Sequence, residues 1–237
     1  MCSSDLVAMS TVQTSALTST QIGALTTRQI TVLQTDDIAA LSTGQIGALG
    51  THQLAVLTTS QIQALETRDI GAISSRVIGA LTTAQIVALT SAQVAALGTV
   101  QVAALTTTQV AALETTDLRA MGTGQIAALT STQVGAMTTR QIVALETADI
   151  VAMSSVQLGA MTTLQLAALT TVQLQAMESR DLASLDTTAL RALSSTQIAS
   201  LTTLQAAALT SSQLNAMSST QLGALNTLDG IALSSNQ

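Results

Sequence analysis

The chain is an eight-residue phrase repeated without insertion or deletion from Asp5 onward. One copy reads Gln-Ile-x-Ala-Leu-Thr-Thr-x, as in residues 101–108, and the sequence holds 29 such octads. Unbroken periodicity means that every copy folds alike and buries its apolar residues against other copies. We therefore predict a single octapeptide-repeat solenoid over residues 5–237, preceded by the non-repeat residues 1–4.

The octad has constant and variable positions, numbered here with Gln as position 1. Position 1 is Gln in 20 copies and Asp in seven, while position 7 is Ser or Thr in all 29. Position 2 is nearly always Ile, Leu or Val, position 4 is mostly Ala, and position 5 is always Leu, Met or Ile. We predict that positions 2, 4 and 5 form the core, that position 7 is a fixed hydroxyl, and that the other positions face water.

A single continuous helix does not fit this period. Eight residues advance an α-helix by about 800°, so the apolar stripe would drift by about 80° with each copy. The chain must therefore turn once per octad.

Short helices have start signals in every octad. Thr at position 6 followed by Gln at the next position 1 forms a capping box, and Leu at position 5 with the following Ile at position 2 forms a hydrophobic staple. In residues 105–113 the helix would run from about Thr107 to Ala112 or Leu113. Position 7 could instead be the N-cap, and the sequence leaves this register open.

A β-solenoid is the alternative, supported by Ile, Val and Thr content and by a hydroxyl that could stack between coils. Tight β-corners want Gly, Asn or Asp at a fixed place, yet the 13 Gly lie mainly at the variable positions 3, 6 and 8. The adjacent apolar positions 4 and 5 also break a strand alternation. We therefore expect an all-α solenoid with one very short helix per octad.

The acidic residues show a second period. The Asp residues of position 1 are spaced by 32 or 48 residues and the Glu residues follow the same 16-residue parity: Asp5, Asp37, Asp69, Asp117, Asp149, Asp181 and Asp229, with Glu66, Glu114, Glu146 and Glu178. This parity predicts two helices per 16-residue coil, with the acidic octads on one face. Duplication of a 16-residue unit would leave the same pattern without structural meaning, and the sequence leaves that alternative open.

Catalytic residue types are nearly missing. His52 is the single His, at an exposed position 8, and Cys2 is the single Cys, outside the repeat. Ser and Thr abound, but a lone His offers them no general base. We expect no enzyme activity, no catalytic residues and no cofactor.

The four Glu-x-x-Asp pairs, such as Glu66 and Asp69, raise the question of calcium. Ca²⁺ takes six to eight oxygen ligands, and two carboxylates at a helix start are more simply partners of the helix dipole. We expect no metal site. The methionines of position 5 are expected to replace Leu in the core.

Charge and hydropathy exclude two kinds of partner. The net charge is −6, the seven Arg are scattered along the chain and aromatic residues are absent, so the sequence offers no nucleic-acid surface. Each apolar run is interrupted after about five residues, far short of a membrane span.

The first six residues, Met1-Cys2-Ser3-Ser4-Asp5-Leu6, resemble the translated end of a common sequencing-library adapter with a GTG codon read as the start. This resemblance implies a metagenomic fragment whose residues 1–4 are not native. The octads themselves resemble the Thr/Gln/Ala/Leu-rich octapeptide arrays of very large bacterial secreted or surface proteins of adhesin type.

That second resemblance implies a spacer or stalk at the bacterial surface or outside the cell, joined to flanking domains and capable of end-to-end association. The alternative is a repetitive binding surface that presents rows of Thr and Ser to ice, a polysaccharide or a protein.

Overall fold

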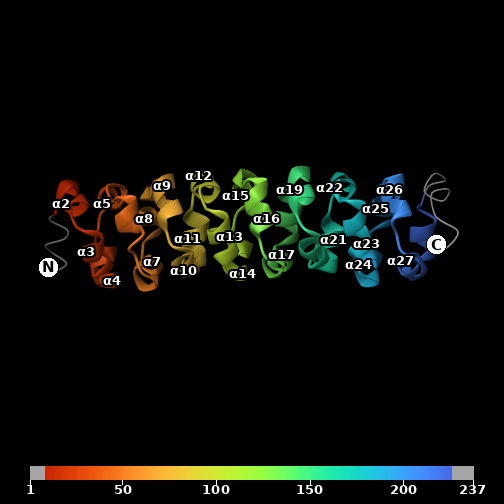
Figure 1. Ribbon diagram of the computed structural model, residues 1–237, viewed down its shortest axis with the longest axis horizontal. Coiled ribbons are helices and arrows are strands. Elements are labelled where there is room, and N and C mark those ends of the chain that lie inside the picture. The colour runs from red at the N-terminus through yellow and green to blue at the C-terminus, as the bar shows by residue number, and fades with distance from the viewer. Residues whose placement is uncertain (1–8, 226–237) are drawn as a thin grey trace. The chain divides into compact units, whose positions relative to one another are not determined.

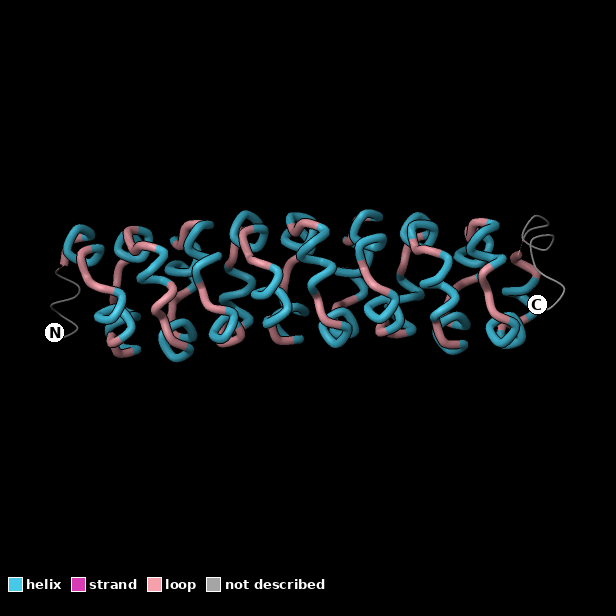
Figure 2. The backbone as a smooth tube through the Cα atoms, in the orientation of Figure 1, coloured by secondary structure: helices cyan, strands magenta, loops and turns pink. Residues whose placement is uncertain are grey.

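The computed structural model describes residues 9–225, and every regular element in that range is a helix (Figures 1 and 2). There is one helix of four to six residues for each octad. No strand occurs between residues 9 and 225, so the all-α prediction is confirmed and the β-solenoid alternative is wrong for this range.

The packing divides the chain into two units, Met1–Met121 and Gly122–Gln237. The helices of the first unit are α2 (Thr11–Ser15), α3 (Ser19–Gly23), α4 (Thr27–Thr31), α5 (Thr35–Ala39), α6 (Thr43–Ile46), α7 (Thr51–Ala55), α8 (Thr59–Ala64), α9 (Thr67–Ala72), α10 (Ser75–Ile78), α11 (Thr83–Ala88), α12 (Ser91–Ala95), α13 (Thr99–Ala104), α14 (Thr107–Ala112) and α15 (Thr115–Ala120).

The helices of the second unit are α16 (Thr123–Ala128), α17 (Ser131–Ala136), α18 (Thr139–Ala144), α19 (Thr147–Ala152), α20 (Ser155–Gly159), α21 (Thr163–Ala168), α22 (Thr171–Ala176), α23 (Ser179–Ser184), α24 (Thr187–Arg191), α25 (Ser195–Ala199), α26 (Thr203–Ala207), α27 (Ser211–Ala216) and α28 (Ser219–Leu222).

Most helices begin with the predicted capping box, and those whose N-caps are Ser74, Glu114, Glu178 and Asp186 lack it. Before α14, the Thr106 backbone N–H donates to Gln109 Oε1 at 2.8 Å, and the Gln109 backbone N–H donates to Thr106 Oγ1 at 3.1 Å. Two of the four N–H groups that a helix start leaves unpaired are thereby satisfied. Position 6 is the N-cap and position 7 is the first helical residue, which settles the register that the sequence left open.

Each helix ends after one or two turns because the backbone becomes extended. Leu113 follows α14 with φ −59° and ψ 137°, and the next N-cap, Glu114, is extended as well. No residue from 9 to 225, glycine included, has a positive φ. The turn therefore needs no glycine, which explains why the Gly residues lie at variable positions.

Positions 2 and 5 supply the core. Val110 at position 2 is fully buried and Leu113 at position 5 is 4 % exposed, and most other octads show the same pair of values. Position 4 is less buried than predicted, since Ala112 and most of its equivalents are only half-buried. The methionines of position 5 are buried as expected, namely Met121, Met137, Met153, Met161, Met177 and Met217.

The number of helices per coil differs from the prediction. Within each unit, a helix contacts the helix three places further along the chain, as in the pairs α5–α8, α8–α11 and α19–α22. Glutamine side chains of position 1 also donate hydrogen bonds to the helix four places earlier. One coil therefore holds between three and four octads, or 24 to 32 residues.

The predicted 16-residue coil with two helices is wrong. With two helices per coil, each helix would contact its second neighbour along the chain. In addition, two single-turn helices joined by extended residues are too short to enclose an apolar core. The 32-residue gaps between acidic residues equal the step to the fourth neighbour, whereas the 48-residue gaps do not.

Both units are solenoids of this kind, each with its apolar side chains inside its coils. No helix among residues 9–225 has the length and apolar character needed to cross a membrane.

Candidate functional site

The polar side chain of position 1 joins successive coils. Gln61 Oε1 accepts from the Thr58 backbone N–H at 2.8 Å, while Gln61 Nε2 donates to the carbonyl oxygens of Ile30 at 2.9 Å and Leu33 at 2.8 Å. One carboxamide thus caps its own helix with its oxygen and pairs two carbonyls of the preceding coil with its nitrogen.

This arrangement repeats along both units and forms what we call the glutamine ladder. Its members donate to carbonyls 28 and 31 residues earlier and are 2–6 % exposed. The members whose bonds are described within one unit are Gln45, Gln53, Gln61, Gln85, Gln93, Gln101, Gln109, Gln157, Gln165, Gln173, Gln197, Gln205, Gln213 and Gln221.

The prediction that position 1 faces water is therefore wrong. A polar residue that recurs at one position can lie on the surface or can pair buried backbone groups, and the repeat pattern is the same in both cases. The near-invariance of Gln was the available signal, because a water-facing position would tolerate more residue types.

The aspartates of position 1 interrupt the ladder. Asp69 is fully buried, and its Oδ2 accepts from the Glu66 backbone N–H at 3.3 Å, as Gln would. A carboxylate has no N–H to donate, and Asp69 Oδ1 has no hydrogen-bond partner. The carbonyls of Ile38 and Leu41, where the ladder would continue, receive no side-chain donor from the described residues.

Two aspartates recover a partner from the hydroxyl of position 7. Ser91 Oγ donates to Asp117 Oδ1 at 2.8 Å, and Ser155 Oγ donates to Asp181 Oδ1 at 2.5 Å. The other oxygen of Asp117, Oδ2, is buried without a partner.

Burial perturbs two of these carboxyl groups. Removal from water raises the pKa of Asp69, although the Glu66 backbone N–H and the Arg68 guanidinium act in the opposite direction. Burial also raises the pKa of Asp149, against the hydrogen bond from the Glu146 backbone. In both cases loss of hydration outweighs the groups that favour the charged form.

Two of the four Glu-x-x-Asp pairs cap a helix start, because Asp69 accepts from the Glu66 backbone N–H and Asp149 from that of Glu146. Glu66 pairs with Arg68, with Oε2 at 2.9 Å from Nε, and Asp69 Oδ1 lies 3.6 Å from the same nitrogen. Glu178, Arg180 and Asp181 repeat this geometry. Between residues 9 and 225, no group of three or more His, Cys, Asp or Glu side chains is placed to hold a metal ion.

The remaining candidate residues do not gather into a catalytic group. His52 is exposed on α7, as predicted, beside a depression of about 320 Å³ that lies between the starts of α4 and α7. Cys2 lies outside the described residues. Most hydroxyls of position 6 accept helix-capping hydrogen bonds, as Thr106 does. These hydroxyl oxygens are therefore already used in stabilising the helix starts.

These observations define a class of protein, a solenoid of capped single-turn helices whose coils are joined by a glutamine ladder. The family model described as the ALTTAQ repeat matches residues 1–35, 30–67, 62–99, 88–115, 110–147, 142–179 and 174–211, and the chain belongs to that family. No curated protein matches the chain.

Proposed function

We propose that this chain is a structural spacer, a stalk that holds other parts of a larger secreted or cell-surface protein apart. The observation that carries the proposal is the uniformity of the coil-to-coil contact. The same two apolar positions and the same glutamine bonds recur through both units. A stack of equivalent coils grows by an equal step for each added octad, as a spacer requires.

The proposal includes the absence of catalysis. The single His is exposed, and the buried Gln side chains of the ladder are occupied by helix capping and by the bonds between coils. Acyl transfer would need a nucleophile activated by a base. The hydroxyl–carboxylate pairs Ser91–Asp117 and Ser155–Asp181 join octads of neighbouring coils, and His52 is part of neither pair.

We further propose that flanking domains or other copies continue the stack. Gln21 is exposed, whereas Gln53, four octads later, is buried because its amide donates to the carbonyls of Ile22 and Leu25. A further coil would bury Gln21 in the same way, whether it came from a flanking segment or from end-to-end association. A location outside the cell follows from the adhesin-like arrays that the octads resemble.

Small-angle X-ray scattering on a length series tests the spacer function. We would compare the full chain with variants that lack eight and sixteen internal octads. The maximum dimension should decrease by the same amount for each eight octads removed, because each octad contributes an equal rise. A compact particle whose radius followed the cube root of chain length would contradict the proposal.

A further inference from the structure

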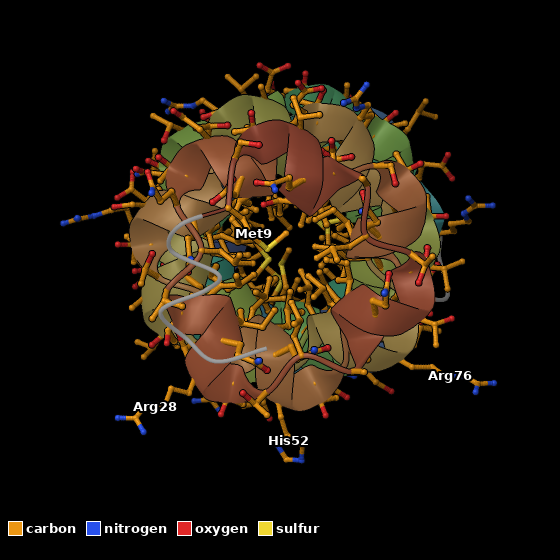
Figure 3. All side chains as sticks on the ribbon, turned by 90° about the vertical axis from the view of Figure 1, so that its left-hand side faces the viewer. Met9, Arg28, His52 and Arg76 are labelled. Carbon is orange, nitrogen blue, oxygen red and sulfur yellow. The ribbon has the colours of Figure 1, made fainter. Side chains whose placement is uncertain are left out.

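The first unit carries a row of exposed basic side chains. These residues are far apart in the sequence. Arg28, His52 and Arg76 all occupy position 8 and are 24 residues apart. Their helices α4, α7 and α10 are successive third neighbours that contact one another. Figure 3 shows the three side chains pointing away from the ribbon around the lower half of the view, with Arg28 at the lower left, His52 at the bottom and Arg76 at the right, so the row turns around the first unit as it advances. We call these residues the basic row.

The basic row has no acidic residues along its own helices. Residues 19–35, 38–65 and 70–113 contain no Asp or Glu, so α3, α4, α6 to α8 and α10 to α14 carry none. The carboxylates of the first unit's described residues belong to α5, α9 and α15, at the opposite edge in Figure 1. The ion pairs found between residues 9 and 225 use Arg68 and Arg180 rather than members of the row.

The depression of about 320 Å³ lies along this row, between the starts of α4 and α7. Its lining includes Thr26, Thr27, Thr51 and His52. Gly50, also in the lining, is an N-cap where most octads have Thr or Ser. A Cβ built on Gly50 would meet only Gln53 Oε1, at 3.8 Å, so a side chain at this position has room to enter the depression.

We propose that this face of the first unit binds an anionic polysaccharide, with one sugar residue in the depression and its carboxylate or sulfate groups paired with the basic row. The volume is at the lower end of small-molecule pockets. The hydroxyls of Thr27 and Thr51 can exchange hydrogen bonds with sugar hydroxyls, whereas the Thr26 hydroxyl is engaged with Gln29 in the capping box. Arg28 and Arg76 offer planar donors that suit carboxylate and sulfate oxygens.

Spacing favours a linear anionic polymer over a second copy of the chain. The row presents one cation per three octads, on helices whose axes lie about 8–10 Å apart. The acidic octads instead recur at 32 or 48 residues, so their carboxylates do not match the row. Nucleic acid is disfavoured because the chain has no aromatic side chain on which bases could stack.

Binding should depend on several contacts at once, because a single exposed ion pair contributes little free energy. The inference goes beyond the spacer function and does not depend on it. A chain that failed to bind glycans could still separate two domains, and a compact chain could still bind them.

The test is retention of the full chain on immobilised alginate and dextran sulfate at low salt, with uncharged dextran as the reference matrix. We expect binding to at least one anionic matrix, no binding to dextran, and release as salt increases. The paired substitution Arg28→Gln with Arg76→Gln should weaken binding by at least about tenfold. The matched control, Arg140→Gln with Arg191→Gln, removes the same charge from the second unit and should have little effect.

Gly50→Thr tests the depression without weakening the fold. The new side chain restores the usual N-cap and fills the space, so we expect unchanged helicity and about fivefold weaker binding. Gly122→Thr is the control, because Gly122 is also an N-cap glycine and a Cβ there would meet nothing within 4 Å. His52→Arg should strengthen binding. Equal retention on dextran, or equal binding by the variants of the row and their controls, would overturn the proposal.

Discussion

At the scale of the residue, the side chain of position 1 has the largest structural effect in the octad. A buried backbone carbonyl without a donor is costly, and each coil presents such carbonyls to the next. Gln is long enough to reach them while its oxygen caps its own helix, as Gln61 shows. An Asp carboxylate at position 1 can still accept the capping hydrogen bond, but it has no N–H to donate to the carbonyls of the preceding coil.

Gln61→Ala should destabilise the folded chain by about 3 kcal/mol, because the Leu33 carbonyl and the Thr58 N–H lose their side-chain partner and the Ile30 carbonyl keeps only the Leu33 N–H as a donor. Urea unfolding followed by circular dichroism measures the change. Gln63→Ala is the control on the same helix, since Gln63 is exposed, and it should cost less than about 0.5 kcal/mol. Equal effects would show that the ladder does not stabilise the coil.

Asp69→Gln should stabilise the fold at neutral pH by about 1–3 kcal/mol, because it removes an unpaired buried oxygen and supplies donors to the carbonyls of Ile38 and Leu41. Asp36→Gln, at an exposed position of the first unit, should change stability by less than about 0.5 kcal/mol.

The advantage of Asp69→Gln should depend on pH. Burial raises the pKa of Asp69 in the folded chain, so the folded state holds the proton more tightly than the unfolded state. The stabilisation from that proton is complete below the unfolded pKa of about 3.9 and is lost as pH rises through the folded value. The difference between variant and parent should therefore shrink on acidification from pH 7 to about pH 4. A gain that grew on acidification would contradict this sign.

At the scale of the element, each helix is too short to be stable alone. Isolated helices below about 12 residues are marginal in water, and these have four to six residues. The capping box and the contacts between coils must therefore supply the stability that so short a helix lacks. Even so, the start of each helix is encoded locally, by the residues at positions 6 and 1.

Thr106→Ala should cost about 1 kcal/mol, because Gln109 N–H loses its acceptor, Thr106 Oγ1. Thr108→Ala alters an exposed residue of the same helix without a capping bond and should stay within about 0.5 kcal/mol. Thermal unfolding of the two variants separates these outcomes. A larger loss of stability for Thr108→Ala than for Thr106→Ala would contradict the assignment of Thr106 as the N-cap.

At the scale of the whole molecule, the helices of each unit contact their third neighbours and the Gln octads are bonded to their fourth, so the register of eight residues must be kept within a unit. Octads with Gln at position 1 make equivalent contacts, so we expect a whole octad to be exchangeable and a partial octad to be disruptive. Cooperativity is therefore expected to pass from coil to coil within each unit.

Deletion of residues 197–204, one complete octad, should leave the helical circular dichroism per residue nearly unchanged, because the neighbouring octads take up the same contacts. Deletion of residues 197–200 alone should lower helicity and broaden the unfolding transition, because it shifts positions 1, 2 and 5 out of register. If both deletions behaved alike, the ladder would not require the eight-residue register.

Much of this fold could be predicted because it depends on near neighbours in the chain. The capping box sits three residues apart, and the observed bounds of α14, Thr107–Ala112, agree with the expectation from residues 105–113. The alignment of Arg28, His52 and Arg76 could not be predicted, since it depends on the contact of every third helix. The 16-residue parity of the acids was misleading because 32 is also the step between fourth neighbours.

The sequence by itself determined that the chain folds as one short helix per octad, where each helix starts, and that positions 2 and 5 are buried. These features follow from local hydrogen bonding and from the spacing of apolar residues. Only the tertiary structure decided that three to four helices complete a coil and that the polar residue of position 1 is buried. The physical reason is that both depend on where the extended residues between helices direct the chain, and on which carbonyls of the preceding coil then lie within reach of a glutamine amide.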